Sequence, residues 1–165
     1  MLAYLFWHRP SEGADIAEYE RRLRAFHRVI SGPSASFRVD PLPFAPEDGY
    51  EDWYLVRTWS ALGSLNDAAV TGARSGPHEA VAALAGAGWG GVYRLLHGAA
   101  VPPSSVRWAT KPSGVSYEDF VQTLSATTLW QRQMVLGPAP EFCLAEEGAA
   151  DGARARSRTP IHLDK

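Results

Sequence analysis

Polar residues capable of acid–base chemistry lie inside strands that are otherwise apolar. His8 ends the apolar stretch 2–9 and shares one strand face with Tyr4 and Phe6, because side chains alternate along a strand. An imidazole has an ordinary pKa of about 6.5, so it exchanges protons near neutral pH. If this face lines a cavity, His8 is a candidate catalytic acid or base, and Tyr4 and Phe6 are candidate substrate contacts. The alternative is an edge histidine that meets solvent.

A second polar residue falls within the expected strand 51–59. Arg57 lies on the same face of that strand as Trp53 and Trp59, because every second residue of a strand points to the same side. A buried guanidinium needs a carboxylate partner or an anionic ligand. Both interpretations stay open, and in the second one Trp53, Arg57 and Trp59 bind a substrate that carries a carboxylate. The candidate protein partners of Arg57 are Asp52, Glu51 and Glu18.

Metal and phosphate sites have little support. No pair of His, Asp or Glu has i, i+4 spacing on a convincing helix face, and the glycine-rich run 86–91 precedes a strand instead of following one. The single cysteine, Cys143, excludes an internal disulfide and a multi-cysteine metal site. Cys143 is flanked by Phe142 and Leu144, which favours a buried, inert thiol. We expect no metal.

Composition narrows the class of protein. The chain has 165 residues, a formal net charge of −2 and 45% hydrophobic residues, enough for one ordinary globular domain. The first 150 residues contain no sustained run of Lys and Arg, so we expect no nucleic-acid partner. The N-terminal segment MLAYLFWHRP lacks the features of a signal peptide, and no apolar run is long enough to span a bilayer. These features and the single cysteine predict a cytoplasmic protein without a membrane partner.

The elements that position the candidate residues follow from periodicity. Asp15 is a good N-cap for a helix whose apolar stripe runs from Ile16 to Ile30. The expected order is strand, helix, strand, strand, helix, strand, at residues 2–9, 16–30, 35–40, 51–59, 62–70 with 78–84, and 92–97. This α+β order predicts a ferredoxin-like plait, an antiparallel sheet with both helices on one face.

The chain after residue 98 predicts a partial second unit. Strands at 106–110 and 141–146 flank a helix capped by Ser116 and a short helical piece at 129–135, in which Trp130 packs on the core. We therefore divide the chain into a ferredoxin-like unit at 1–98, a partial α+β unit at 106–146 that completes the sheet or a barrel, and a flexible tail at 147–165. The tail contains Arg154, Arg156 and Arg158 as a solvated basic patch.

Two stretches carry a resemblance to a known superfamily. The run 54–81, with Trp59, Ser60, Leu65, Ser75 and Pro77-His78, resembles the antibiotic-biosynthesis-monooxygenase type of dimeric α/β barrel. The run 111–120, KPSGVSYEDF, looks like the start of an EthD-like module. The resemblance implies a curled sheet that pairs with a second sheet, usually across a homodimer, around a small cavity. If residues 106–146 supply that second sheet, the barrel closes within one chain.

The resemblance also implies possible roles for His78. Haem-degrading members of the superfamily carry an iron-ligating histidine at this position, whereas other members carry one that packs or bonds the backbone. Both roles stay open for His78, as a catalytic or ligand residue or as a structural one. The haem-degrading members also use an asparagine in the first strand, and residues 4–8 contain none. The resemblance gives Trp59 mainly a packing role.

Three functional hypotheses follow. The first is a small-molecule enzyme, either a cofactor-independent monooxygenase or an isomerase/cyclase acting on an aromatic or polyketide-like compound. In it, His8 and His78 are catalytic, and Tyr4, Phe6, Trp53, Arg57 and Trp59 bind the substrate. The second is a non-catalytic ligand-binding or interaction domain on the same scaffold. The third is haem binding through His78.

Overall fold

The computed structural model describes residues 1–42, 44–45, 47–135, 137–145 and 156–163. The described strands are β1 (Leu2–Pro10), β2 (Ser34–Val39), β3 (Gly49–Val56), β4 (Ala85–His97), β5 (Ser105–Ala109), β6 (Thr128–Val135), β7 (Phe142–Ala145), β8 (Arg156–Ser157) and β9 (Thr159–Leu163). The described helices are α1 (Ile16–His27), α2 (Trp59–Ala69), the 3-10 turn η1 (Gly72–Arg74), α3 (Ser75–Ala82) and α4 (Tyr117–Thr123). Among these residues, no helix is both long and apolar enough to cross a membrane.

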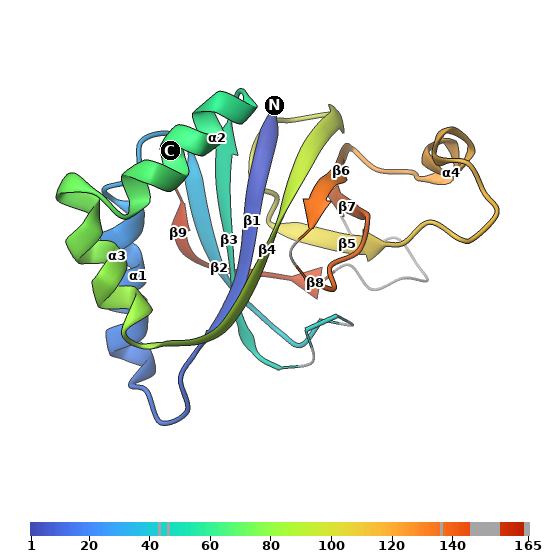
Figure 1. Ribbon diagram of the computed structural model, residues 1–165. Coiled ribbons are helices and arrows are strands. Elements are labelled where there is room, and N and C mark those ends of the chain that lie inside the picture. The colour runs from blue at the N-terminus through green and yellow to red at the C-terminus, as the bar shows by residue number, and fades with distance from the viewer. Residues whose placement is uncertain (43, 46, 136, 146–155, 164–165) are drawn as a thin grey trace.

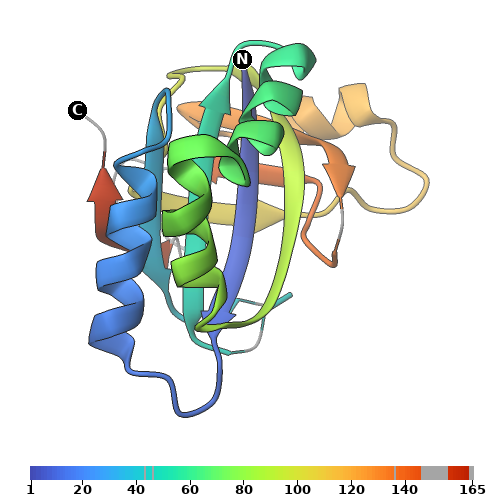
Figure 2. The ribbon, with the colours of Figure 1, turned by 60° about the vertical axis from the view of Figure 1, so that its left-hand side comes forward.

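All described strands belong to one curled antiparallel sheet, which confirms the expected α+β class. The strand order is β8-β5-β7-β6-β4-β1-β3-β2-β9. Helices α1, α2 and α3 cover one face of β1 to β4, and β5 crosses behind the opposite face (Figures 1 and 2). The strands of the second part, β5 to β7, therefore extend the sheet of the first part. The cavity described below lies on the helix-covered face.

The first helix forms as the sequence predicts. Asp15 is its N-cap and accepts hydrogen bonds from the backbone N–H groups of Ala17 and Glu18. The helix ends at His27, three residues before the expected end. Its buried stripe includes Tyr19 and Leu23, which pack on the β1–β3 surface. This stripe places Tyr19 over the sheet.

Tryptophans fill the concave face of the sheet, opposite the helices. Trp7, Trp53 and Trp130 are fully buried there, and Trp53 meets Trp130 edge to face at a centroid distance of 5.6 Å. Cys143 belongs to the same cluster, so its expected burial is confirmed, and burial raises the pKa of its thiol. The interior of the curl is therefore a packed core.

Two segments differ from the expected secondary structure. Residues 129–135, expected to be helical, form strand β6 between β4 and β7, because pairing on both sides satisfies its backbone groups. Residues 86–91, expected to end a helix, lie within β4. A Cβ at Gly88 would lie 2.6 Å from the Phe6 ring, and one at Gly90 would lie 2.8 Å from the Tyr4 ring. Glycine in β4 thus makes room for the aromatic side chains of β1.

The expected flexible tail is wrong for the residues that the structure describes. Residues 156–157 pair with β5 and residues 159–163 pair with β2, so this short segment supplies the strands at both edges of the sheet. Arg158, expected to be solvated, is buried between the two pairings. Its partner is Glu51 on β3, at 2.8 Å, which explains why a charged residue lies inside. Arg154 lies outside the described residues.

Replacing Gly90 by alanine is expected to destabilise the fold by about 1–3 kcal/mol, because the new methyl group would overpack the Tyr4 ring and the Leu5 carbonyl. Gly63 in α2 is the matched control, since a Cβ there meets no atom within 4 Å. Gly63→Ala is expected to stabilise by up to about 1 kcal/mol through helix propensity. Urea unfolding of both variants measures the difference, and equal effects would contradict the overpacking argument.

Candidate functional site

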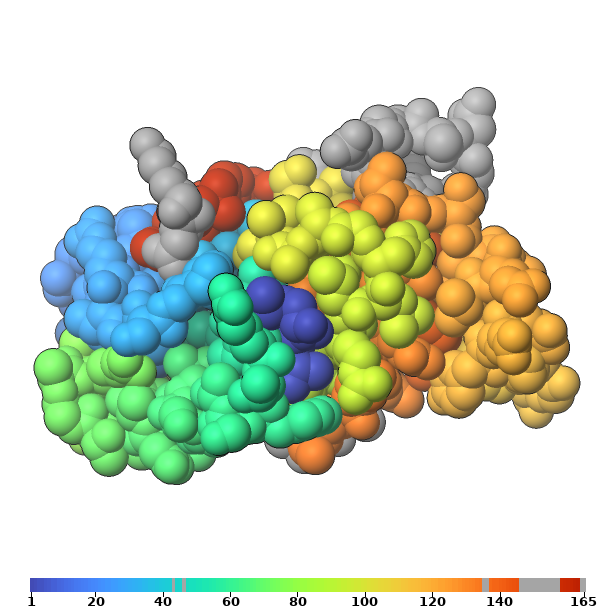
Figure 3. Space-filling view, turned by 90° about the horizontal axis from the view of Figure 1, so that it is seen from above, coloured from blue at the N-terminus to red at the C-terminus, as the bar shows by residue number. Residues whose placement is uncertain are grey.

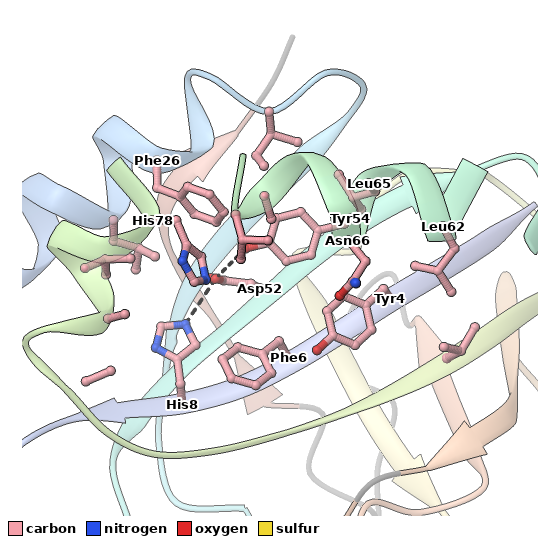
Figure 4. A pocket seen from close by; sticks show the side chains of 18 of the residues that line it. Tyr4, Phe6, His8, Phe26, Asp52, Tyr54, Leu62, Leu65, Asn66 and His78 are labelled. Atoms are coloured by element: carbon pink, nitrogen blue, oxygen red, sulfur yellow. Dashed lines mark hydrogen bonds and ion pairs between the residues drawn. The ribbon is translucent and has the colours of Figure 1, made fainter. Parts of the chain in front are cut away.

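A cavity of about 610 Å³ lies between the sheet and the helical layer (Figure 4). Side chains from β1, β3 and β4 form its floor, and α1, α2 and α3 supply its walls and roof. Trp59, Val70 and Met134 also line it and are 45%, 56% and 51% exposed, so they mark its rim. At the upper end of the molecule, the start of β1 lies between the segment leading into α2 and the end of β4 (Figure 3).

The polar centre of this cavity is the carboxylate of Asp52, which is 2% exposed. Three groups converge on its Oδ2 atom. Nε2 of His8 lies at 3.1 Å, Nε2 of His27 lies at 3.3 Å, and the Tyr54 hydroxyl donates a hydrogen bond of 2.9 Å. Figure 4 shows His8 on β1 and Tyr54, two residues after Asp52 on β3, on either side of the Asp52 carboxylate. Because these three groups supply the partners that a buried charge requires, we expect the Asp52 carboxylate to be ionised.

Strand register brings His8 and Asp52 together. In the β1–β3 pairing, Phe6 lies opposite Asp52 and His8 lies opposite Tyr50, which makes His8 and Asp52 diagonal neighbours on one face. Helix α1 then supplies Tyr19 and His27 from above that face. The site therefore needs two strands in one register and one helix packed across them.

The second nitrogen of each imidazole also has a partner. Nδ1 of His8 lies 2.5 Å from the Tyr19 hydroxyl, and Nδ1 of His27 lies 2.9 Å from the Ser34 hydroxyl. The His8 ring stacks on Tyr50 at a centroid distance of 5.6 Å. Tyr19, His8 and Asp52 thus form a continuous chain of polar contacts, in which Nδ1 of His8 is hydrogen-bonded to Tyr19 and Nε2 lies at ion-pair distance from Asp52.

The electrostatics keep Asp52 ionised and the tyrosines neutral. Burial acts to raise the pKa of Asp52, but the two neighbouring imidazoles outweigh it and hold that pKa well below its ordinary value. Burial and the Asp52 charge raise the pKa values of Tyr19 and Tyr54 above the ordinary range. The cluster can therefore accept a proton on an imidazole next to a fixed negative charge, and tyrosine hydroxyls act there as donors.

The structure places five of the seven candidate site residues at the cavity. Trp53 lies on the opposite face of β3, in the tryptophan core, where its indole donates to Glu51 at 2.5 Å. Arg57 is exposed at the bend after β3 and does not line the cavity, so its expected burial is wrong. No carboxylate contact of Arg57 is found among the described residues. The five residues that line the cavity are Tyr4, Phe6, His8, Trp59 and His78.

His78 and Trp59 occupy different parts of the wall. His78 comes from α3, is partly buried, and packs edge to face against Phe26 at a centroid distance of 5.5 Å. Trp59 begins α2 instead of ending a strand, because Thr58 caps this helix through the N–H of Ala61. Among the described residues, no group of three or more His, Cys, Asp and Glu side chains has the arrangement of a metal site.

Sequence reasoning did not assign a site role to four residues that build the polar centre: Asp52, His27, Tyr19 and Tyr54. The usable signal was Asp52, a carboxylate between Tyr50 and Tyr54 on one face of a largely apolar strand. A carboxylate in a doubly covered strand requires a nearby cationic or donor group. His27 carried no such signal, because it flanks the apolar stripe of α1 and its contact with Asp52 is tertiary.

Comparisons of the chain with protein-family models, curated proteins and solved structures find no match in any of the three. The functional argument therefore depends on the geometry of the cavity and its polar centre.

Proposed function

We propose that the protein is a small-molecule enzyme that binds an aromatic or polyketide-like compound in this cavity and acts on it by general acid–base catalysis. The observation that carries the proposal is the chain Tyr19–His8–Asp52 at the floor of an aromatic cavity. A volume of about 610 Å³ falls within the range of about 300–1,000 Å³ that is typical of ligand pockets. Mostly apolar walls with a few convergent polar groups are equally typical.

The proposed proton path uses side chains of this chain alone. In this path Nε2 of His8 faces Oδ2 of Asp52 at 3.1 Å, and Nδ1 of His8 accepts a hydrogen bond from the Tyr19 hydroxyl. When the Tyr19 oxygen takes a proton from an enolisable C–H or a phenol, the Tyr19 proton moves to His8. The imidazolium then faces the Asp52 carboxylate, which stabilises it. Return of the proton to another substrate atom gives an isomer, and removal of this proton is also a first step towards oxygenation.

The proposed superfamily has independent support in strand order. Within the larger sheet, β4, β1, β3 and β2 are consecutive and antiparallel, with α1 and α3 on one side. This order is the one expected of a ferredoxin-like plait. We propose on this basis that the chain is an α/β-barrel protein of the antibiotic-biosynthesis-monooxygenase or EthD-like type. The homodimer that this resemblance implies is likewise proposed.

A ligand-binding protein without catalysis is the second candidate. Its supporting observation is that both nitrogens of His8 and of His27 already lie against polar protein groups. Polar contacts of this kind also serve to rigidify a cavity floor. The two candidates share the cavity and differ in whether Tyr19 and His8 exchange a proton with the ligand.

Exchange of the α-protons of 2-tetralone in D2O, followed by NMR, tests the proposal. This flat aromatic ketone needs only a base and a nearby donor to exchange. We expect the protein to accelerate exchange, and His8→Gln and Tyr19→Phe to reduce that acceleration by about 10²–10⁴-fold. His97→Gln is the control, because His97 is exposed at the end of β4 and does not line the cavity. Binding of 2-tetralone without accelerated exchange would favour the non-catalytic candidate.

A further inference from the structure

Acidic and basic side chains are not balanced in the lining of the cavity. Among the described residues that line it, none is a lysine or an arginine, and Asp52 is the one carboxylate. The arginines of α1 are engaged elsewhere: Arg21 and Arg22 bind Glu18, and Arg24 pairs with Glu20. A ligand carboxylate or phosphate would therefore be desolvated beside Asp52 without a guanidinium or ammonium partner, which is unfavourable.

Three buried atoms of the polar centre have no hydrogen-bond partner among the described residues: Nε2 of His8, Nε2 of His27 and Oδ1 of Asp52. The two imidazole nitrogens lie at ion-pair distance from Oδ2 of Asp52, which also accepts the hydrogen bond from Tyr54, whereas Oδ1 has no such contact. Buried polar atoms are nearly always satisfied, because an unpartnered one costs free energy. Asp52 lines the cavity, so a hydrogen-bond donor on a bound molecule could supply the missing partner of Oδ1.

The cavity floor favours a flat aromatic molecule. The Tyr4 ring lies 6.2 Å from Phe6 and 6.0 Å from Tyr54, at interplanar angles of 28° and 24°. These near-parallel rings form a row across β1 and β3 on the cavity face, next to Asp52 (Figure 4). A planar ring system would contact this row over a wide apolar area.

We propose that the ligand of this cavity is an uncharged, flat hydroxyaromatic molecule whose hydroxyl group donates a hydrogen bond to Oδ1 of Asp52. The inference rests on the proposed function in one respect, namely that the cavity binds a small molecule. It adds the ligand's charge, its shape and the atom that recognises it. A hydroxyl bound at Oδ1 lies on the carboxylate that also holds His8, next to the proposed proton path.

Four naphthalene derivatives of similar size test the inference at pH 7 by calorimetry or by quenching of tryptophan fluorescence. The probes are naphthalene, 2-naphthol, 2-naphthoate and the protonated amine 2-naphthylmethylammonium. We expect 2-naphthol to bind at least about tenfold more tightly than naphthalene, because a hydrogen bond to a charged acceptor is stronger than a neutral one. 2-Naphthoate should bind at least about tenfold more weakly than 2-naphthol, because no lysine or arginine among the described residues lines the cavity. The ammonium should also bind at least about tenfold more weakly, because two imidazoles already face the Asp52 carboxylate. In Asp52→Asn the preference for 2-naphthol over naphthalene should shrink, whereas in Asp48→Asn, on an exposed loop, it should persist.

Each other outcome has a defined meaning. Failure of all four probes to bind would contradict the proposed function itself. Naphthoate binding as tightly as 2-naphthol would leave a binding cavity but overturn the charge selectivity, and a tighter ammonium complex would do the same with the opposite sign. Equal affinities for naphthalene and 2-naphthol would overturn the hydrogen bond to Asp52. These wild-type comparisons hold even if Asp52→Asn fails to fold.

Discussion

Replacing Arg158 by methionine is expected to destabilise the folded chain by about 3–5 kcal/mol, because it leaves an unpaired carboxylate inside the tryptophan core. Glu51 is 0% exposed and accepts hydrogen bonds from the indoles of Trp7 and Trp53, at 2.8 and 2.5 Å. Arg158 is its one cationic partner among the described residues, at 2.8 Å. Free energies from urea unfolding give the size of the effect.

Arg158 also has contacts that methionine partly keeps. Its guanidinium lies 3.7 Å from the centre of the Phe37 ring and donates to the Pro103 carbonyl at 2.7 Å. In the double variant Glu51→Gln/Arg158→Met the buried charge is absent, so stability should recover by more than 1 kcal/mol relative to Arg158→Met. Arg57→Met is the control: Arg57 is exposed, so a change within about 0.5 kcal/mol is expected. No recovery in the double variant would show that packing, and not charge, makes Arg158 important.

The part of the fold that sequence predicts is the part with strong periodicity. The strand that carries His8 and the helix that begins after Asp15 have clear apolar patterns, and both form where expected. Strand β6 was missed because its mixture of large apolar, glutamine and arginine residues fits a helix as well as a strand. Residues 156–163 have no strand pattern, since their pairing with β5 and β2 depends on a buried ion pair formed with a distant strand.

The candidate site likewise contains residues that the sequence predicts and residues that it does not predict. The face shared by Tyr4, Phe6 and His8 follows from alternation within one strand, and it does line the cavity. Arg57 was assigned to a buried strand position, but β3 ends at Val56, so its side chain lies in a bend. The partners of Asp52 come from β1 and α1, and no local pattern gives the register between β1 and β3 or the packing of α1.

Replacing Asp52 by asparagine is expected to lower any acid–base activity of the cavity by about 10²–10⁴-fold. The carboxylate orients His8 through Nε2 and stabilises the imidazolium that forms when Tyr19 passes its proton. Asparagine has nearly the same shape but no charge, so the fold can persist while the imidazolium loses its counter-ion. Exchange of 2-tetralone measures the loss, and Asp48→Asn is the matched control at an exposed position. An unchanged rate in Asp52→Asn would remove Asp52 from the proton path.

The same variant should change how stability depends on pH. The pKa of Asp52 is held well below its ordinary value in the folded chain, so the folded state binds fewer protons than the unfolded state around pH 4. Asp52 therefore stabilises the fold above its unfolded pKa of about 3.9, and this contribution falls as pH drops below that value towards the folded pKa. Urea unfolding between pH 6 and pH 3 should show a shallower loss of stability in Asp52→Asn than in the wild type. Parallel curves would mean that Asp52 is not preferentially ionised in the folded protein, and the charge that the proposed proton path needs would then be missing.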